Sequence, residues 1–281
     1  MRVLRTPAEL SEWAETHRRE GRRVGLVPTM GFLHRGHLSL MEAGRERADT
    51  TAVSIFVNPT QFGPNEDLAR YPRDLEGDLR KCQEAGMDAV FTPDAGGMYP
   101  PGHRTFVEVT GLQDGLCGAR RPGHFRGVAT VVTQLFALAR PHLAVFGEKD
   151  WQQLQIIRRL ALDLHLGVEV VGRPIVREPD GLAMSSRNAY LSPLDRSRAL
   201  ALSRGLQAAR ARWSAGERAA DALCEAVRAQ LRAAEVRQDY VELVAPATLE
   251  PLVRAEQPDA RLLVAAFVGA TRLIDNTAIG S

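Results

Sequence analysis

Apolar residues in the first 175 positions fall into short runs that alternate with stretches of helical periodicity. The short runs have the length and β-branched content of buried strands, and they lie at residues 24–29, 51–57, 89–92, 143–146 and 168–171. Between them, apolar positions predict helices near residues 37–47, 72–85, 127–139 and 150–164. Strands that alternate with helices predict an α/β fold, a Rossmann-like, doubly wound parallel sheet.

The pattern changes after a connector rich in Pro and Gly at residues 173–181. Two Ala/Arg-rich helices are predicted near residues 193–212 and 216–234, and strands at residues 239–244, 261–268 and 271–275. Gly269 and Ala270 are compatible with a hairpin between the last two strands. Helices followed by adjacent strands predict a smaller C-terminal α+β domain, so we expect domains at residues 1–175 and 176–281.

Composition narrows the class of protein. The 281 residues include 36 basic and 34 acidic side chains, a net charge of +2, which favours no nucleic-acid partner and makes any anion site local. Three scattered cysteines, Cys82, Cys117 and Cys224, predict no disulfide framework and favour a reducing cytoplasm. The chain starts without an apolar signal core and has no run of membrane-spanning length, so we expect no membrane partner.

The most informative segment joins the first predicted buried strand to the next helix. It reads Val-Pro-Thr-Met-Gly-Phe-Leu-His-Arg-Gly-His over residues 27–37 and carries His34 and His37 three positions apart. Glycines at a strand-to-helix turn permit a sharp bend or close approach to a ligand. The free N–H groups of a first helical turn favour an anion. We therefore expect two proton-carrying side chains beside a phosphate site.

Two other interpretations of the histidine pair stay open at this point. His34 and His37 could bind a metal, but two ligands do not complete a zinc site, and no Cys or carboxylate stands at a suggestive spacing nearby. The pair could also be structural, although His is not a favoured core residue. The flanking glycines and the preceding strand favour a functional role.

Further polar segments follow predicted strands. Asn58 and Gln61 come after the second strand, and their amides can bind hydroxyls or carboxylates without adding charge, although Asn-Pro is also a turn signal. Lys149 lies in Gly-Glu-Lys-Asp after the fourth strand and suits a phosphate. Residues 121–128, Arg-Pro-Gly-His-Phe-Arg-Gly-Val, could touch phosphate or form a surface loop. In a parallel sheet, segments that follow strands meet at one edge.

A Gly-flanked segment, residues 181–188, carries two hydroxyls and a guanidinium. These groups are typical of a loop that closes over the phosphates of a nucleotide. Because the segment lacks apolar periodicity, we expect it to be poorly ordered without nucleotide.

Together these motifs resemble the pantothenate synthetase family, within the nucleotidylyltransferase and class I aminoacyl-tRNA synthetase superfamily. The His-x-Gly-His turn resembles the first superfamily signature, and Met-Ser-Ser-Arg-Asn at residues 184–188 the second. Three further motifs follow the order of the family: Phe-Val-Asn-Pro-x-Gln-Phe, Arg-Pro-Gly-His-Phe-Arg-Gly-Val and Phe-Gly-Glu-Lys-Asp. The resemblance covers nearly the whole chain and departs at no motif position.

The resemblance implies ATP-dependent condensation of pantoate with β-alanine through a pantoyl adenylate, with release of pyrophosphate and AMP. It implies catalytic roles for His37, the proton donor, His34 and Lys149. It implies a pantoate site at Gln61, Gln153 and Asn58. The ATP-binding residues it implies are Met30, Gly31, Phe32, Leu33, His34, Arg35, Gly36, His37, Gly147, Glu148, Lys149, Asp150, Val176, Met184, Ser185, Ser186 and Arg187.

The same resemblance implies Mg²⁺ as the companion of the triphosphate, a C-terminal lid domain and a homodimer. The metal ligands stay unassigned, and Asp78 is a candidate for an indirect contact to the metal. Two rival functions stay open. Another nucleotidylyltransferase of this fold would need a basic acceptor pocket in place of Gln61 and Gln153. A non-catalytic nucleotide- or RNA-binding module would have lost a motif or gained a basic face.

Overall fold

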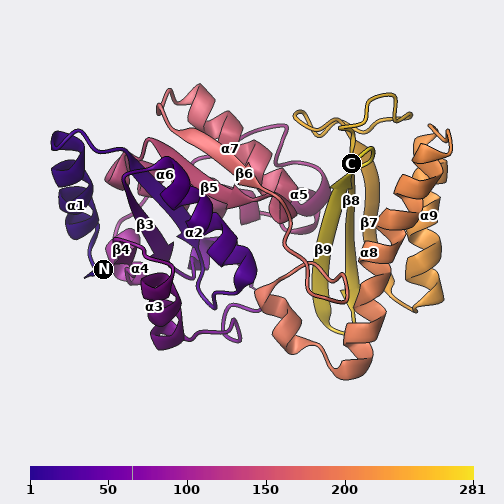
Figure 1. Ribbon diagram of the computed structural model, residues 1–281, viewed down its shortest axis with the longest axis horizontal. Coiled ribbons are helices and arrows are strands. Elements are labelled where there is room, and N and C mark those ends of the chain that lie inside the picture. Colours follow the sequence, from indigo (N-terminus) through magenta and orange to yellow (C-terminus); the bar gives the residue numbers. More distant parts are fainter. Residues whose placement is uncertain (65) are drawn as a thin grey trace. The chain divides into compact units, whose positions relative to one another are not determined.

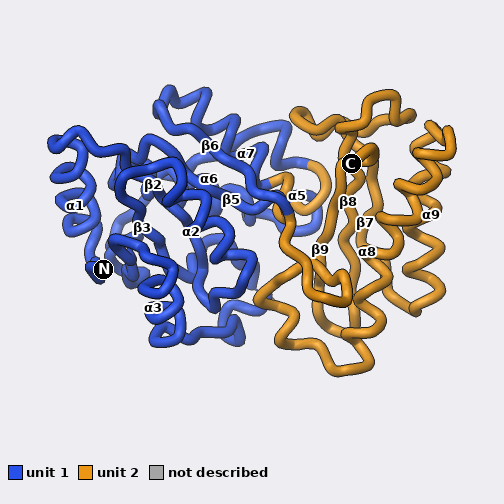
Figure 2. Tube along the Cα trace, viewed as in Figure 1, with its two compact units in different colours: residues 1–114, 118–148, 153–174 blue, residues 115–117, 149–152, 175–281 orange. Residues whose placement is uncertain are grey.

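A computed structural model describes residues 1–64 and 66–281. The chain forms two compact units (Figure 2). Unit 1 comprises residues 1–114, 118–148 and 153–174, and unit 2 comprises residues 115–117, 149–152 and 175–281. Two short segments that precede residue 153 therefore belong with the C-terminal part of the chain.

Unit 1 contains a six-stranded parallel sheet in the order β1-β4-β3-β2-β5-β6 (Figure 1). The strands are β1 (Arg2–Leu4), β2 (Val24–Thr29), β3 (Thr50–Ile55), β4 (Ala89–Phe91), β5 (Leu143–Gly147) and β6 (Glu169–Arg173). The helices of this part of the chain are α1 (Pro7–Arg19), α2 (Arg35–Arg47), α3 (Leu75–Glu84), α4 (Ala95–Met98), α5 (Leu116–Arg120), α6 (His124–Ala139) and α7 (Trp151–Asp163), with short 3-10 turns η1 (Pro59–Gln61) and η2 (Glu148–Asp150).

Helices cover both faces of this sheet. Val145 and Phe146 are neighbours on β5, so their side chains point to opposite faces. Val145 packs into a core cluster with Met41 of α2, whereas the Phe146 ring lies 6.4 Å from the Phe136 ring of α6, centroid to centroid. The predicted doubly wound α/β fold is therefore confirmed.

The pattern of apolar runs missed two elements at the start of the chain, β1 and α1. Helix α1 begins with a capping box, in which the Glu9 N–H donates to Thr6 Oγ1 and the Thr6 N–H donates to the Glu9 carboxylate. Pro7 occupies the first helical turn. These residues are a sequence signal for a helix start, and the amphipathic face behind it buries Leu10 and Trp13.

Unit 2 is an antiparallel three-stranded sheet with two long helices, so the predicted α+β character is confirmed. Its elements are η3 (Ser186–Tyr190), α8 (Pro193–Ser214), α9 (Ala220–Ala233), β7 (Arg237–Val244), β8 (Arg261–Val268) and β9 (Thr271–Ala278). The hairpin at Gly269 is present, and this glycine has a positive φ of 57°. Apolar side chains from α8, α9 and the sheet form one buried cluster.

Some element boundaries differ from the prediction. Strand β3 ends at Ile55, earlier than predicted, because Asn58 turns the chain and caps η1. Strand β9 continues to Ala278, past the predicted end at residue 275, because β8 pairs with all of it. The added stretch contains the buried polar residue Asn276. Within the described part of the chain, no helix is long and apolar enough to cross a membrane.

Candidate active site

The strand order of unit 1 reverses between β2 and β5. From β2 the chain continues to β3 and β4 on one side, and from β5 to β6 on the other. Among the described residues, the ladder between β2 and β5 ends at the pair Leu26–Ala144, whereas β2 and β3 stay in register to Thr29–Ile55. The carboxyl ends of β2 and β5 are thus not paired with each other at the switch point, where doubly wound sheets bind their ligands.

The turn after β2 has an unusual backbone, held by a buried carboxylate. Gly31 and Phe32 have positive φ angles of 82° and 50°. Asp78 of α3, 1 % exposed, accepts the Phe32 N–H at Oδ2 and the Leu33 N–H at Oδ1, both at 2.7 Å. A Cβ on Gly31 would lie 3.0 Å from Asp78 Oδ2, so glycine is needed here for the positive φ and for this close approach.

These two bonds give Asp78 a role that the sequence did not reveal. Burial raises the pKa of its carboxyl, although the two backbone donors and Lys81 act to lower it. Because both carboxylate oxygens accept hydrogen bonds from the turn, Asp78 is a clamp on the turn, and its indirect contact to a metal stays a prediction. Among the described residues, no three His, Cys, Asp or Glu side chains gather as a metal site would require.

His34 and His37 face each other at the start of α2. Their ring centroids lie 4.0 Å apart, and the His34 backbone N–H donates to His37 Nδ1 at 3.3 Å. Because Nδ1 accepts, the proton of the neutral His37 ring lies on Nε2, which can donate to a ligand. The amides of residues 31–34 all have side-chain acceptors, on Thr29, Asp78 and His37. The expected free N–H groups are therefore those of Arg35 and Gly36, which have no acceptor in the described part of the chain.

Gln61 and Asn58 also lie together, just after β3. Gln61 is 8 % exposed, and its Nε2 is 3.0 Å from Met30 Sδ. Asn58 Nδ2 donates to Gln61 Oε1 at 3.2 Å and to the Gly127 carbonyl at 3.1 Å. Asn58 Oδ1 accepts from the Tyr99 hydroxyl at 2.8 Å. These bonds show Asn58 as the residue that orients Gln61, and its contact with a substrate stays a prediction.

The loop at residues 121–128 supports Gln61 from the other side. His124 Nδ1 donates to the Gln61 carbonyl at 2.8 Å, which leaves Nε2 to accept from Arg121 at 3.0 Å. Arg121 also forms a two-pronged ion pair with Glu66, at 2.7 and 2.6 Å. Burial acts to raise the pKa of Glu66, but the bonds and charge of Arg121 outweigh it and lower the pKa. His124 thus holds the Gln61 carbonyl, and the Arg121–Glu66 ion pair holds His124.

Gln153, the other predicted pantoate ligand, lies in the first turn of α7 in unit 1. Its side chain is half-buried, and its amide has no hydrogen bond to any of the described residues. Gln153 therefore keeps its hydrogen-bonding capacity for a ligand, unlike Asn58.

Lys149 is held by unit 2. Its side chain is 19 % exposed, and its carbonyl accepts from Asn276 Nδ2 of β9 at 2.9 Å. Arg261 Nε donates to Asn276 Oδ1 at 2.7 Å, which fixes the orientation of that amide. The Arg261 guanidinium also stacks 3.7 Å from the Trp151 ring centroid. The backbone that carries Lys149 is thus fastened by two buried residues that the sequence analysis did not identify.

The segment with the two serines begins with a tight hairpin. The Met184 N–H donates to the Val176 carbonyl at 3.0 Å. The Arg177 guanidinium donates two hydrogen bonds, of 2.7 and 2.9 Å, to the buried Asp275 carboxylate of β9. Leu182, 4 % exposed, packs into the core of unit 2. The segment therefore has an apolar anchor that periodicity could not reveal, because it is a single leucine, and its poor order without nucleotide stays a prediction. Its closure over a nucleotide stays a prediction.

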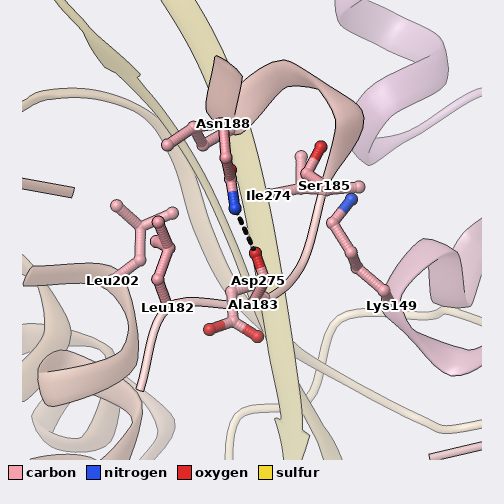
Figure 3. A pocket seen from close by; sticks show the side chains of 9 residues that line it. Lys149, Leu182, Ala183, Ser185, Asn188, Leu202, Ile274 and Asp275 are labelled. Carbon is pink, nitrogen blue, oxygen red and sulfur yellow. Dashed lines mark hydrogen bonds between the residues drawn. The ribbon is translucent and has the colours of Figure 1, made fainter. Parts of the chain in front are cut away.

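A small pocket in unit 2 brings the cationic and hydroxyl groups together. Lys149, Ser185, Asn188 and Asp275 are among the residues that line it. Figure 3 shows the Lys149 ammonium group directed toward the loop that carries Ser185. The Ser185 hydroxyl accepts from the Arg187 N–H at 3.3 Å and caps η3.

The predicted site residues fall into one group in each unit. Unit 1 holds Met30, Gly31, Phe32, Leu33, His34, Arg35, Gly36, His37, Asn58, Gln61, Gly147, Glu148 and Gln153. Unit 2 holds Lys149, Asp150, Val176, Met184, Ser185, Ser186 and Arg187. Each group contains polar side chains that are fixed by buried partners.

The doubly wound sheet and the histidine-bearing turn at its switch point are features of nucleotide-binding α/β enzymes. The chain belongs to the pantoate-beta-alanine ligase family, whose sequence model matches residues 2–278. The family resemblance of the motifs is thereby confirmed.

Relatives and solved structures agree with this assignment. The pantothenate synthetase of Myxococcus xanthus is 65% identical over 282 residues, which cover 99% of this chain and 96% of that protein. A crystal structure of the Thermus thermophilus pantothenate synthetase superposes with a TM-score of 0.94 at 49% identity, with full coverage of both chains. A Francisella tularensis pantoate-beta-alanine ligase, described as complexed with beta-gamma ATP and beta-alanine, has a TM-score of 0.84 at 29% identity and covers 100% of this chain and 98% of its own.

Proposed function

We propose that this protein condenses pantoate with β-alanine at the expense of ATP. The observation that carries the proposal is the His34–His37 turn at the switch point of a chain that belongs to the pantoate-beta-alanine ligase family. In the first step the pantoate carboxylate attacks the α-phosphate of ATP, and the bond to pyrophosphate breaks. In the second step the β-alanine amine attacks the acyl carbon, AMP leaves, and the amine gives up a proton.

The groups of unit 1 suit the departure of pyrophosphate. His37 carries its proton on Nε2, and the Arg35 and Gly36 amides lack protein acceptors in the described part of the chain. Together they can donate to phosphate oxygens whose charge increases in the transition state. The clamp from Asp78 keeps this turn in place, because two charge-assisted bonds hold consecutive amides.

Unit 2 supplies the cationic groups. Lys149, Ser185, Ser186 and Arg187 are proposed to bind the triphosphate, and residues 176–281 to act as a lid. Mg²⁺ is proposed to arrive with ATP, since magnesium at such sites is coordinated largely by phosphates and water.

The neutral amides are proposed to select the acceptor. Gln61 and Gln153 can bind the hydroxyls of pantoate and leave its carboxylate free to attack, whereas a close cation would reduce its nucleophilicity. A nucleotidylyltransferase that acts on a phosphate ester would need a basic pocket, and the basic residue beside Gln61, Arg121, is already paired with Glu66. We also propose a cytoplasmic homodimer, as the family implies.

Pyrophosphate release tests the reaction course. With ATP and pantoate but without β-alanine, rapid-quench analysis should detect bound pantoyl adenylate and one pyrophosphate per site. The variant Gln61→Ala should raise the KM for pantoate far more than the KM for ATP, because a buried polar contact to the acceptor is lost. Pyrophosphate that appears only when β-alanine is present would exclude the adenylate mechanism.

A further inference from the structure

A cation at the start of α8, Arg196, holds two carboxylates of the hairpin that leads to Met-Ser-Ser-Arg at residues 184–187, here called the serine motif. The Arg196 guanidinium donates to Glu178 Oε2 at 2.5 Å and to Asp180 Oδ2 at 3.1 and 2.8 Å. All three residues belong to unit 2. The Glu178 side chain is 21% exposed, so solvent screens its ion pair less than one at the surface. Helix α8 therefore fixes the Glu178 carboxylate.

Glu178 in turn holds Asn188, the residue that directly follows the serine motif. Asn188 Nδ2 donates to Glu178 Oε1 at 2.6 Å and to the Ala183 carbonyl at 3.1 Å. The Asn188 backbone N–H donates to the Ser185 carbonyl at 3.0 Å. Because Glu178 uses one carboxylate oxygen for each partner, it links α8 to the turn that carries the serine motif.

The Asn188 amide has one fixed orientation. Its two N–H groups face the Glu178 carboxylate and the Ala183 carbonyl, and Figure 3 shows the bond to Ala183. Its Oδ1 is shielded from solvent and has no hydrogen-bond partner among the described residues. Asn188 lines the same pocket as Lys149 and Ser185. A buried acceptor without a partner is unfavourable, so this orientation depends on the two acceptors that hold the N–H groups.

We propose that Glu178 is a positioning residue for ATP, and that it acts through Asn188 on the serine motif. The inference rests on the proposed function, in which the serine motif binds the triphosphate. The position requires a carboxylate, because glutamine offers one oxygen and one NH₂ group to two donors. With the NH₂ group toward Arg196, two donors oppose each other. With it toward Asn188, that amide must turn over, and the Ala183 carbonyl loses its donor.

A titration with ATP and Mg²⁺ measures this role without any need for turnover. In isothermal titration calorimetry, Glu178→Gln should bind ATP at least about tenfold more weakly, equal to about 1.4 kcal/mol. The KM for pantoate should not change, because the serine motif is not part of the proposed pantoate site.

Asp180→Asn is the matched control. Asp180 binds the same Arg196 and accepts the Leu182 N–H at 3.2 Å, but among the described residues it has no hydrogen bond to Asn188. This variant loses a charge from the same cluster and should keep its affinity for ATP. An equal loss of ATP affinity in both variants would overturn the role of Glu178, because the loss would then come from Arg196.

A double-mutant cycle tests the route through Asn188. Asn188→Ala should weaken ATP binding as Glu178→Gln does, and the double variant should bind no more weakly than the weaker single variant, since both changes break one link. Losses that add in the double variant, or an unchanged affinity in either single variant, would overturn the proposal. If melting curves show that Glu178→Gln does not fold, the affinity of Asn188→Ala decides alone.

The two proposals fail in different ways. An unmodified chain that binds ATP but releases no pyrophosphate with pantoate would refute the proposed reaction and leave the positioning role to the titrations. A chain that releases pyrophosphate, and whose Glu178→Gln variant binds ATP normally, would refute the positioning role alone. An unmodified chain that does not bind ATP would overturn both.

Discussion

Replacement of Asp78 by Asn should damage catalysis more than stability. Asn has nearly the same shape, but it offers one oxygen where the Phe32 and Leu33 amides each use one at 2.7 Å. One backbone N–H then faces an NH₂ group, and a buried donor without a partner costs about 1–3 kcal/mol. Loss of the buried charge, whose pKa is raised by burial, offsets part of this cost. We therefore expect the free energy of unfolding to fall by about 1–2 kcal/mol.

The activity should fall further because the released amides belong to the turn that presents the histidines. A displacement of about 1 Å at a reacting group costs up to about 100-fold, so kcat/KM for ATP should fall by about 10- to 100-fold. Hydrogen exchange should show lost protection at the Phe32 and Leu33 amides. If the clamp is the whole role of Asp78, the magnesium concentration needed for half-maximal pyrophosphate release should not change.

Asp74→Ala is the matched control. Asp74 caps the same helix, accepts the Gly77 N–H at 3.0 Å and does not contact the turn. Its loss should cost about 1 kcal/mol of stability, similar to Asp78→Asn, with little change in turnover. The clamp would be refuted if Asp78→Asn kept normal kcat/KM and normal amide protection. A raised magnesium requirement in that variant would instead support the interpretation of Asp78 as an indirect contact to the metal.

Three further predictions address other parts of the site. His37→Ala and Lys149→Ala should each lower turnover by about 100- to 1000-fold with little change in melting temperature; a normal rate in the His37 variant would remove the histidine pair from the mechanism. Asn276→Asp keeps the acceptor for Arg261 but loses the donor to the Lys149 carbonyl. Steady-state kinetics should therefore show a lower kcat and a higher KM for ATP, about a tenfold fall in kcat/KM, with the KM for pantoate unchanged. Equal shifts in both KM values would contradict the role of Asn276 in positioning Lys149. Because Arg121 lowers the pKa of Glu66 against the effect of burial, this ion pair stabilises the fold above the unfolded Glu pKa of about 4.3, and the stabilisation is lost as pH falls through the lower folded pKa. Urea unfolding should therefore show a difference in the free energy of unfolding between the original chain and Glu66→Gln that narrows below about pH 4.3. A difference that widens in acid would contradict a lowered pKa of Glu66.

The sequence by itself determined the class of fold and the residues at the strand ends. Buried strands such as β2 and β5 are continuous apolar runs, and the turn to α2 carries its glycines and histidines within a few positions. These signals are local, so periodicity and spacing suffice to find them. The order of the motifs then identified the family, and the chain was confirmed as a member of it.

Only the tertiary structure decided what holds these residues in place. Asp78 lies 46 positions from Phe32, and Asn276 lies 127 positions from Lys149, so no local pattern connects either residue with its partner. Asn276 lies past the predicted end of the last strand, although β8 pairs with it and the fold buries it. A buried polar side chain is stable only where a hydrogen-bond partner meets it, and folding brings that partner from a distant part of the chain.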